Sequence, residues 1–169
     1  MIELMEVKTA ELSGAVLDWA VMVADGFRLV RVGYLGMHGE GWCDETPEQI
    51  GMPQWFATKT DGGVGAYWVK DEGEQVFHAL WPNYTDPLMH KPRSPSSKWA
   101  HGGPLIDLYD PDERRLPDRS RIAEVWLDLP NGDANAGVGI GPTRLIAVCR
   151  AIVASVMGDT VSVPRELLV

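Results

Sequence analysis

The C-terminal segment Gly139–Val169 constrains the fold of this chain more than any other part of the sequence. It reads GIGPTRLIAVCRAIVASVMGDTVSVPRELLV and contains start and stop signals for one helix. Pro142 suits the first helical position, because its missing N–H is not needed there, and Gly158 is suited to end the helix. Residues 160–163 then alternate as a short strand. Between the two signals, apolar residues recur at helical spacing: Leu145, Ile146, Val148, Cys149, Ile152, Val153 and Val156.

A second helix is predicted near the N-terminus, where six apolar residues share one helical face: Leu12, Ala15, Val16, Trp19, Ala20 and Val23. Gly26 can end this helix in the left-handed conformation. Four further strands are predicted, and a turn at 71–73 joins two of them into a hairpin: 27–34, 66–69, 75–81 and 122–129. The last strand has one apolar face, and its other face carries Glu124, Trp126 and Asp128. The remaining stretches are interpreted as loops or surface connections: 35–65, 82–104, 105–120 and 131–141.

These elements predict an α+β fold, because helical and strand segments do not alternate strictly along the chain. A length of 169 residues and an apolar fraction of 45% fit one domain with a sizeable core. We therefore expect a single domain over 1–169. Its antiparallel or mixed sheet should pack against an N-terminal and a C-terminal helix.

The acidic composition limits the classes of partner. The net charge of −9 is spread along the chain, without the clustered Lys and Arg that bind duplex nucleic acid. No apolar run approaches the length of a membrane span, and no targeting segment is recognised, which predicts a cytoplasmic protein and no membrane partner. The two cysteines give no disulfide framework. Seven tryptophans and a high apolar content are compatible with a homo-oligomer.

Two segments resemble the NinX-like family of small bacteriophage proteins, a family of unknown function. They are SPSSKWAHGGPLI at 94–106 and GPTRLIAVCRAIVASVMGDTVSVPREL at 141–167. Weaker similarity covers the opening helix, TAELSGAVLDWAVMVADG, so the resemblance spans roughly a third to a half of the chain. Residues 35–93 exceed the length expected of this family and are interpreted as an insertion. The resemblance implies a phage origin and an accessory role in the host cytoplasm, and it supplies no catalytic residues.

The start of the C-terminal helix is the first candidate site. Free backbone N–H groups and the helix dipole favour an anion at a helix N-terminus. Two guanidinium groups and one hydroxyl nearby are suited to phosphate. The alternative is a plain helix start, with both arginines solvated or paired with surface carboxylates. The predicted ligand-binding residues of this site are Gly141, Thr143, Arg144 and Arg150.

The segment 94–104 is the second candidate site. Trp99 can stack on a base, and the glycine pair permits close approach of the backbone to a ligand. The alternative is a structured loop that Trp99 packs in place. We predict that this segment meets the start of the C-terminal helix in one site. The predicted ligand-binding residues here are Ser94, Ser96, Trp99, His101, Gly102 and Gly103.

Known motifs indicate no catalytic centre, metal site or cofactor. The four histidines lack zinc-ligand spacing, and the sequence has no nucleophile elbow, Walker loop or HExxH motif. Three functions remain, and we rank binding of a small phosphorylated, nucleotide-like ligand first. That binding would proceed without turnover and would sequester a host signal. An acidic protein-interaction factor that modulates a host enzyme ranks second, and a nucleotide hydrolase without a recognised motif ranks third.

Overall fold

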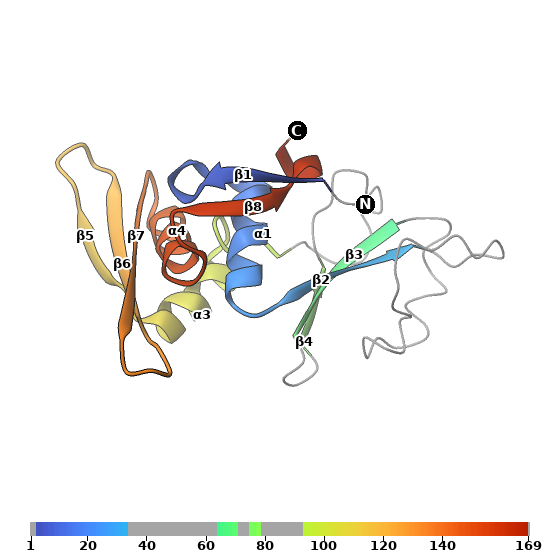
Figure 1. The fold of residues 1–169 in the computed structure, drawn as a ribbon. Coiled ribbons are helices and arrows are strands. Elements are labelled where there is room, and N and C mark those ends of the chain that lie inside the picture. The colour runs from blue at the N-terminus through green and yellow to red at the C-terminus, as the bar shows by residue number, and fades with distance from the viewer. Residues whose placement is uncertain (1–2, 34–63, 71–74, 79–92, 169) are drawn as a thin grey trace. The chain divides into compact units, whose positions relative to one another are not determined.

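The computed structural model describes four stretches of the chain (Figure 1): 3–33, 64–70, 75–78 and 93–168. The chain forms two compact units, and the second is inserted into the first in sequence. The first unit consists of Met1–Asp25 and Ser94–Val169, and the second of Gly26–Arg93. The insertion expected at 35–93 lies largely outside the described residues and stays a prediction.

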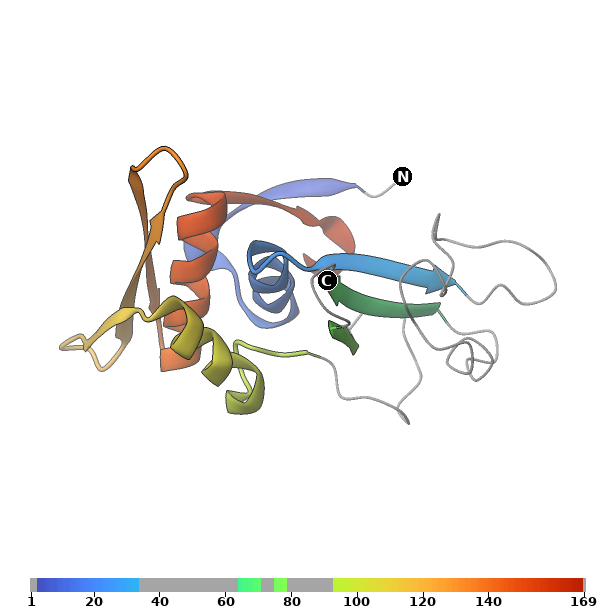
Figure 2. The same ribbon diagram turned by 90° about the horizontal axis from the view of Figure 1, so that it is seen from below.

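Helix α4 (Arg144–Met157) is the centre of the first unit. On one side it packs against a three-stranded antiparallel sheet of β5 (Asp112–Arg115), β6 (Arg121–Asp128) and β7 (Ala134–Gly141). On its other side it packs against helix α1 (Gly14–Ala24). Figures 1 and 2 show the same order of layers in both views, with α4 between the sheet and α1.

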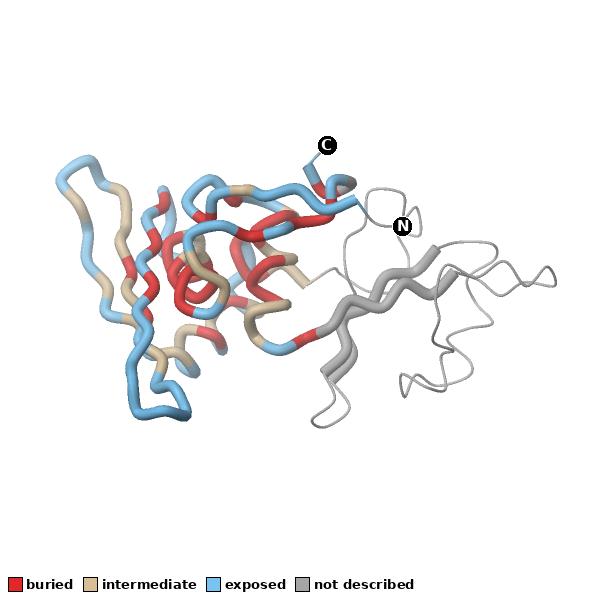
Figure 3. Tube along the Cα trace, in the orientation of Figure 1, coloured by how far each residue is buried: buried red, intermediate tan, exposed pale blue. Residues whose placement is uncertain are grey.

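The composition of α4 explains this central position. Its apolar residues surround the helix axis, and most of them are buried (Figure 3), with Val156 near the C-terminal end exposed. A helix that is apolar on every side must be covered on every side. The predicted helix is confirmed with one correction at its start. Thr143, not a helical Pro142, occupies the N-cap, and its Oγ1 accepts a hydrogen bond from the Ile146 N–H at 3.2 Å.

Strand β7 lies directly on α4 because the strand face that meets the helix is mostly glycine. Added Cβ atoms on Gly137 and Gly139 would overlap main-chain atoms of α4, and one on Gly141 would lie 2.6 Å from Cγ2 of Ile146. Only residues without side chains allow so close an approach. The loop expected over 131–141 is therefore wrong for most of its length.

Both ends of the first unit are joined by a two-stranded antiparallel sheet. Strand β1 (Leu4–Lys8) pairs with β8 (Thr160–Pro164), which confirms the predicted C-terminal strand. The 3-10 turn η1 (Thr9–Glu11) follows β1, and Thr9 Oγ1 donates a hydrogen bond to the Gly158 carbonyl at 2.6 Å. The turn η2 (Arg165–Leu168) follows β8. The sequence patterns did not indicate β1.

A third helix, α3 (Trp99–Tyr109), occupies a stretch that was expected to be loop. Gly102, Gly103 and Pro104 disfavour a helix by propensity, but packing overrides that preference. A Cβ on Gly102 would lie 2.6 Å from Cδ2 of Leu145 and would overlap the Pro95 carbonyl. Glycine at this position lets α3 pack closely against α4.

The second unit contributes one described sheet, in the order β2–β3–β4. The strands are β2 (Arg28–Gly33), β3 (Val64–Lys70) and β4 (Gln75–His78), and both pairings are antiparallel. The predicted pairing of the second and third strands is confirmed by the register Lys70↔Gln75. With α1, α3, α4 and three small antiparallel sheets among the described residues, the α+β fold class is confirmed.

Candidate functional site

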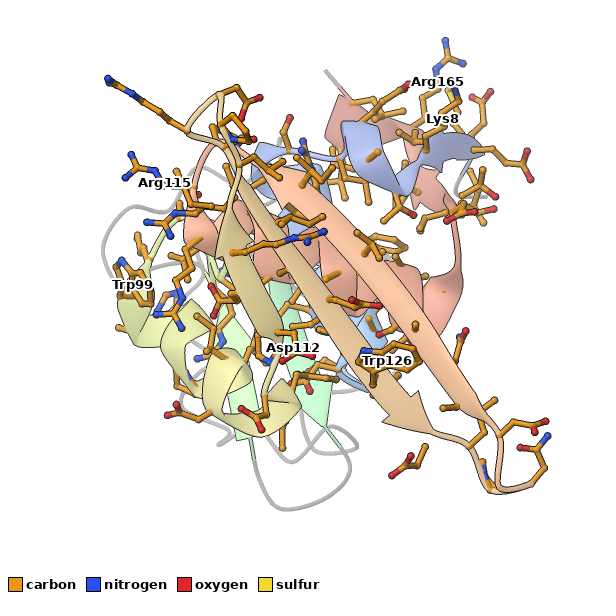
Figure 4. All side chains as sticks on the ribbon, turned by 90° about the vertical axis from the view of Figure 1, so that its left-hand side faces the viewer. Lys8, Trp99, Asp112, Arg115, Trp126 and Arg165 are labelled. Atoms are coloured by element: carbon orange, nitrogen blue, oxygen red, sulfur yellow. The ribbon has the colours of Figure 1, made fainter. Side chains whose placement is uncertain are left out.

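The two segments that were predicted to share a site meet at Trp99 and Arg144. Each is the first residue of its helix, Trp99 of α3 and Arg144 of α4. The Cζ atom of Arg144 lies 5.4 Å from the centroid of the Trp99 ring, within the range of a cation–π interaction. Trp99 is 55% exposed, and Figure 4 shows its side chain at the margin of the molecule. The two segments therefore meet at an exposed surface.

Glu113 on β5 holds Arg144 in this position. Nε of Arg144 donates to the two carboxylate oxygens of Glu113 at 2.8 and 2.6 Å, and Nη2 donates to Oε1 at 2.6 Å. These hydrogen bonds are the main cause that raises the pKa of Arg144, so its guanidinium stays charged. The side chain of Glu113 is 18% exposed and that of Arg144 is 43% exposed. This pairing is the arrangement foreseen in the plain-helix alternative.

The residues before α3 brace the turn that leads into this helix. The Ser96 N–H donates to Oδ1 of Asp18 on α1 at 2.8 Å, and Ser96 itself is buried. Burial raises the pKa of Asp18, and the hydrogen bonds from Ser96 partly oppose that effect. Nδ1 of His101 accepts the Ser94 N–H at 2.8 Å, which closes the turn onto the helix. Ser94, Ser96 and His101 thus have structural contacts.

Arg150 is also engaged within the fold. Its Nε donates to the Leu12 carbonyl at 2.9 Å, and its Nη1 donates to the Ile140 carbonyl at 2.6 Å. It therefore links the segment between η1 and α1 to the end of β7. Burial lowers the pKa of Arg150 from its ordinary value.

The predicted site residues thus separate into two groups. Trp99 and Arg144 form the exposed contact, with Thr143 adjacent in sequence and also exposed. A Cβ on Gly103 would come no closer than 4.0 Å to Trp99, so this glycine has space around it. The other six predicted residues have packing or bracing contacts, and their ligand-binding role stays a prediction: Ser94, Ser96, His101, Gly102, Gly141 and Arg150.

A second surface, which sequence reasoning did not propose as a site, is the face of the β5–β7 sheet that points away from α4. Side chains alternate along strands, and the buried Ala123 and Val125 lie opposite Gly139 and Gly137 on the α4 side. We call the opposite side the outer face. Its residues, by the strand register, are Asp112, Arg114, Ile122, Glu124, Trp126, Asp128, Ala134, Ala136, Val138 and Ile140.

Trp126 and two carboxylates mark the centre of the outer face. Trp126 is 57% exposed, and Figure 4 shows its ring lying on the side of the sheet turned to the viewer. Asp112 and Glu124 are direct cross-strand neighbours in the register of β5 and β6. Like charges at such positions destabilise a sheet, so this pair favours a cation beside it. The alternation of 122–129 already placed Trp126 beside Glu124, but the pairing with Asp112 is a long-range contact.

Comparisons with known proteins add no identity to this geometry. The chain matches no protein-family model and no curated protein. The resemblance to the NinX-like family accordingly stays a prediction. Among the described residues, no cluster of three or more His, Cys, Asp or Glu side chains could hold a metal ion. In the same part of the chain, every helix is too short or too polar to cross a bilayer.

Proposed function

We propose that this chain is an acidic protein-interaction factor that binds a basic surface of another protein through its outer face. The observation that carries the proposal is the exposed Trp126 beside the carboxylate pair of Asp112 and Glu124. Of the three functions predicted from sequence, this one is supported best by the geometry. Most groups expected to hold phosphate have partners inside the fold, whereas the outer face of the first unit presents an aromatic ring and acidic groups outward.

Trp126 supplies the apolar anchor of the proposed contact. Tryptophan is enriched among residues that dominate binding energy, because its large ring buries much area at little entropic cost. Around it the outer face carries three carboxylates and one guanidinium, on Asp112, Glu124, Asp128 and Arg114. A Lys or Arg of the partner would relieve the repulsion between Asp112 and Glu124. The net charge of −9 would also raise the rate of association with a basic partner.

The experiment compares two equally exposed tryptophans in pull-downs from host lysate. Trp126→Ala should lose a stoichiometric partner that the wild type retains, while the control Trp99→Ala should keep it. The double variant Asp112→Asn/Glu124→Gln should weaken binding, and the wild-type complex should weaken as salt concentration rises. A wild type without a stoichiometric partner, or a partner that Trp126→Ala still retains, would contradict the proposal.

The family resemblance sets the biological context of this proposal. A phage accessory protein would act in the host cytoplasm, and its target would be a host enzyme with a basic surface. Enzymes that bind nucleic acid are of this kind, because the surfaces with which they bind it are basic. Occupation of that surface would inhibit or modulate the enzyme without any chemistry by the chain itself.

Binding of a small phosphorylated, nucleotide-like ligand is a second candidate, favoured by the contact between Arg144 and Trp99. Among the described residues, Nη1 of Arg144 makes no hydrogen bond, so it could hold a phosphate while Nε and Nη2 stay on Glu113. A base would stack on the exposed ring of Trp99. Thermal shifts with a nucleotide panel test this candidate. Trp99→Ala and Arg144→Gln should abolish a shift that Trp126→Ala keeps, and absence of any wild-type shift would contradict it.

The nucleotide hydrolase ranks last, as it did from sequence. It would require product formation from a nucleotide that vanishes in the variants His101→Ala or Arg150→Lys. Both residues have structural contacts, so a loss of activity would count only if each variant remained folded.

A further inference from the structure

Strand β7 forms one edge of its sheet. The strand order is β5–β6–β7, so one side of β7 pairs with β6 and the other side has no strand beside it in this sheet. An edge strand presents a row of backbone N–H and C=O groups that can pair with another chain. Two hydrogen bonds show which residues of β7 direct these groups toward the open edge.

Both hydrogen bonds give the same alternation. At the turn between β6 and β7, the Leu129 N–H donates to the Asp133 carbonyl at 2.7 Å. Hydrogen-bonded pairs alternate along an antiparallel ladder, so the odd-numbered residues of β7 are the ones that bond to β6. Independently, the Ile140 carbonyl accepts from Arg150, so the backbone of this even-numbered residue points away from β6. The even-numbered residues Ala134, Ala136 and Val138 consequently direct their N–H and C=O groups toward the open edge.

The sequence of β7 lacks the devices that protect an edge. The strand reads ANAGVGIG, without a charged residue or a proline. Natural edge strands are protected by lysine, proline, bulges or a cover. Arg150 covers the edge at Ile140, which leaves the stretch from Ala134 to Val138 open in the first unit.

The side chains of β7 are inverted relative to an ordinary one-sided strand. In such a strand the apolar side chains face the core and the polar ones face solvent. Here glycines at 137, 139 and 141 face α4, while Val138 and Ile140 are 51% and 48% exposed. The contacts within the first unit therefore leave unused both the backbone edge and the apolar side chains of the same strand.

We propose that a second copy of this chain pairs with the open edge of β7 as an antiparallel strand. A second copy fits this edge because β7 is uncharged over its whole length. Two molecules of net charge −9 would therefore meet there without like charges in the paired strands. A twofold axis at Ala136 places Ala134 of one copy opposite Val138 of the other. The three pairs would form about six backbone hydrogen bonds, and the side chains opposite each other are small or apolar.

This pairing joins two three-stranded sheets into one six-stranded sheet. The two outer faces would then become continuous, which brings two copies of Trp126 to one surface. The inference does not rest on the proposed function, because it concerns the strand edge and not the outer face. If both hold, the dimer would present two anchor sites to its partner.

Native mass spectrometry of the full chain tests the pairing. The wild type should appear at twice 18.6 kDa. Ala136→Pro removes an edge N–H without touching the ladder to β6, and Val138→Lys adds a charge at the edge, so both should yield monomer. The matched control Leu108→Lys places the same charge on an exposed leucine of α3 and should remain dimeric.

A wild type that is monomeric at its highest soluble concentration overturns the proposal, and so does a dimer that survives both edge variants. Loss of the dimer in Leu108→Lys overturns it as well, because association would then not depend on the edge. If Ala136→Pro fails to fold, Val138→Lys still tests the proposal.

The strand register between the two copies is tested separately by the variant Ala136→Cys, made on a Cys43→Ser background. The two Cα atoms would lie about 5.5 Å apart, so mild oxidation should link the copies, whereas Leu108→Cys should not link; the reverse result refutes the twofold axis.

Discussion

Replacing Gly139 with alanine gives the most direct test of how α4 and β7 pack. A Cβ at this position would overlap the Ala147 carbonyl and the Ala151 N, and would lie 2.8 Å from Cβ of Arg150. These are atoms of the α4 backbone or are rigidly attached to it, so no side-chain rotation can relieve the overlap. The helix would have to move by on the order of 1 Å, which a close-packed interior resists.

The expected loss of stability is at the upper end of the range for overpacking. Extra methyl groups in a packed core destabilise by about 1–3 kcal/mol, and an overlap with the backbone of the central helix should cost about 3 kcal/mol. For a chain of 169 residues this corresponds to a fall in Tm of roughly 6–12 °C. The outer face of β7 would be unchanged.

Gly103→Ala is the matched control, because it makes the same chemical change inside α3 with space around it. The nearest atom to its Cβ is Cε3 of Trp99 at 4.0 Å. Alanine is a better helix former than glycine, so this variant should gain about 0.5–1 kcal/mol. Urea denaturation followed by circular dichroism measures both variants. Equal stability of Gly139→Ala and the wild type would refute the close contact of β7 with α4.

Three further predictions concern the candidate site. Thr143→Ala removes the N-cap of α4 and should lower the free energy of unfolding by about 1 kcal/mol, measured by urea denaturation. Arg150→Lys replaces the forked guanidinium, whose Nε and Nη1 reach two separate carbonyls, with one ammonium nitrogen, and should cost about 1–3 kcal/mol. Any thermal shift with nucleotides should stay unchanged in this variant, and a selective loss of that shift would instead support a ligand role. Asp18→Asn should stabilise the chain at neutral pH. Burial raises the folded-state pKa of Asp18, so the wild type gains stability as pH falls through that value, and the advantage of the asparagine variant should shrink toward acid. An advantage that is constant with pH would contradict this.

Periodicity predicted the elements whose side chains carry a strong alternation. Helices α1 and α4 and strand β6 were recognised because large apolar residues repeat on the face that meets the core. The boundaries of α4 followed from Gly158 and from the residues before Arg144. Such patterns are local, and in α1 the predicted face is only partly the buried one. Val16 and Ala20 are buried as expected, but Trp19 and Val23 are half-buried. The other buried residues of this helix are Leu17, Val21 and Met22.

Strand β7 and helix α3 could not be recognised in this way. The core-facing positions of β7 are glycine, so the segment has no apolar alternation toward the core and reads as a loop. In α3, Gly102, Gly103 and Pro104 argue against a helix by propensity, and only the fit of Gly102 against Leu145 and the Pro95 carbonyl explains the choice. Both elements depend on contacts that are distant in sequence.

In the candidate sites, too, only some of the contacts could be predicted from the sequence. The meeting of Trp99 with Arg144 was expected, because both segments carry the family resemblance. Glu113, which holds Arg144, was not foreseen, because β5 was interpreted as a polar connection. The pairing of Asp112 with Glu124 depends on the same strand register. The register between short polar strands that are distant in sequence is specified by no apolar pattern, so a single sequence does not predict it.

The alternation of β7 has two consequences that substitutions can separate. Glycines on one face bring α4 onto the strand, and apolar residues on the other face, with an unpaired backbone edge, form the proposed contact with a second copy. Gly139→Ala should therefore lower the stability of the fold without adding charge to the edge. Val138→Lys should abolish the dimer with little effect on the folded monomer, because its side chain is already exposed. If Val138→Lys instead destabilised the monomer as strongly as Gly139→Ala, the outer face would be part of this chain's own core, and the case for a second copy would fail.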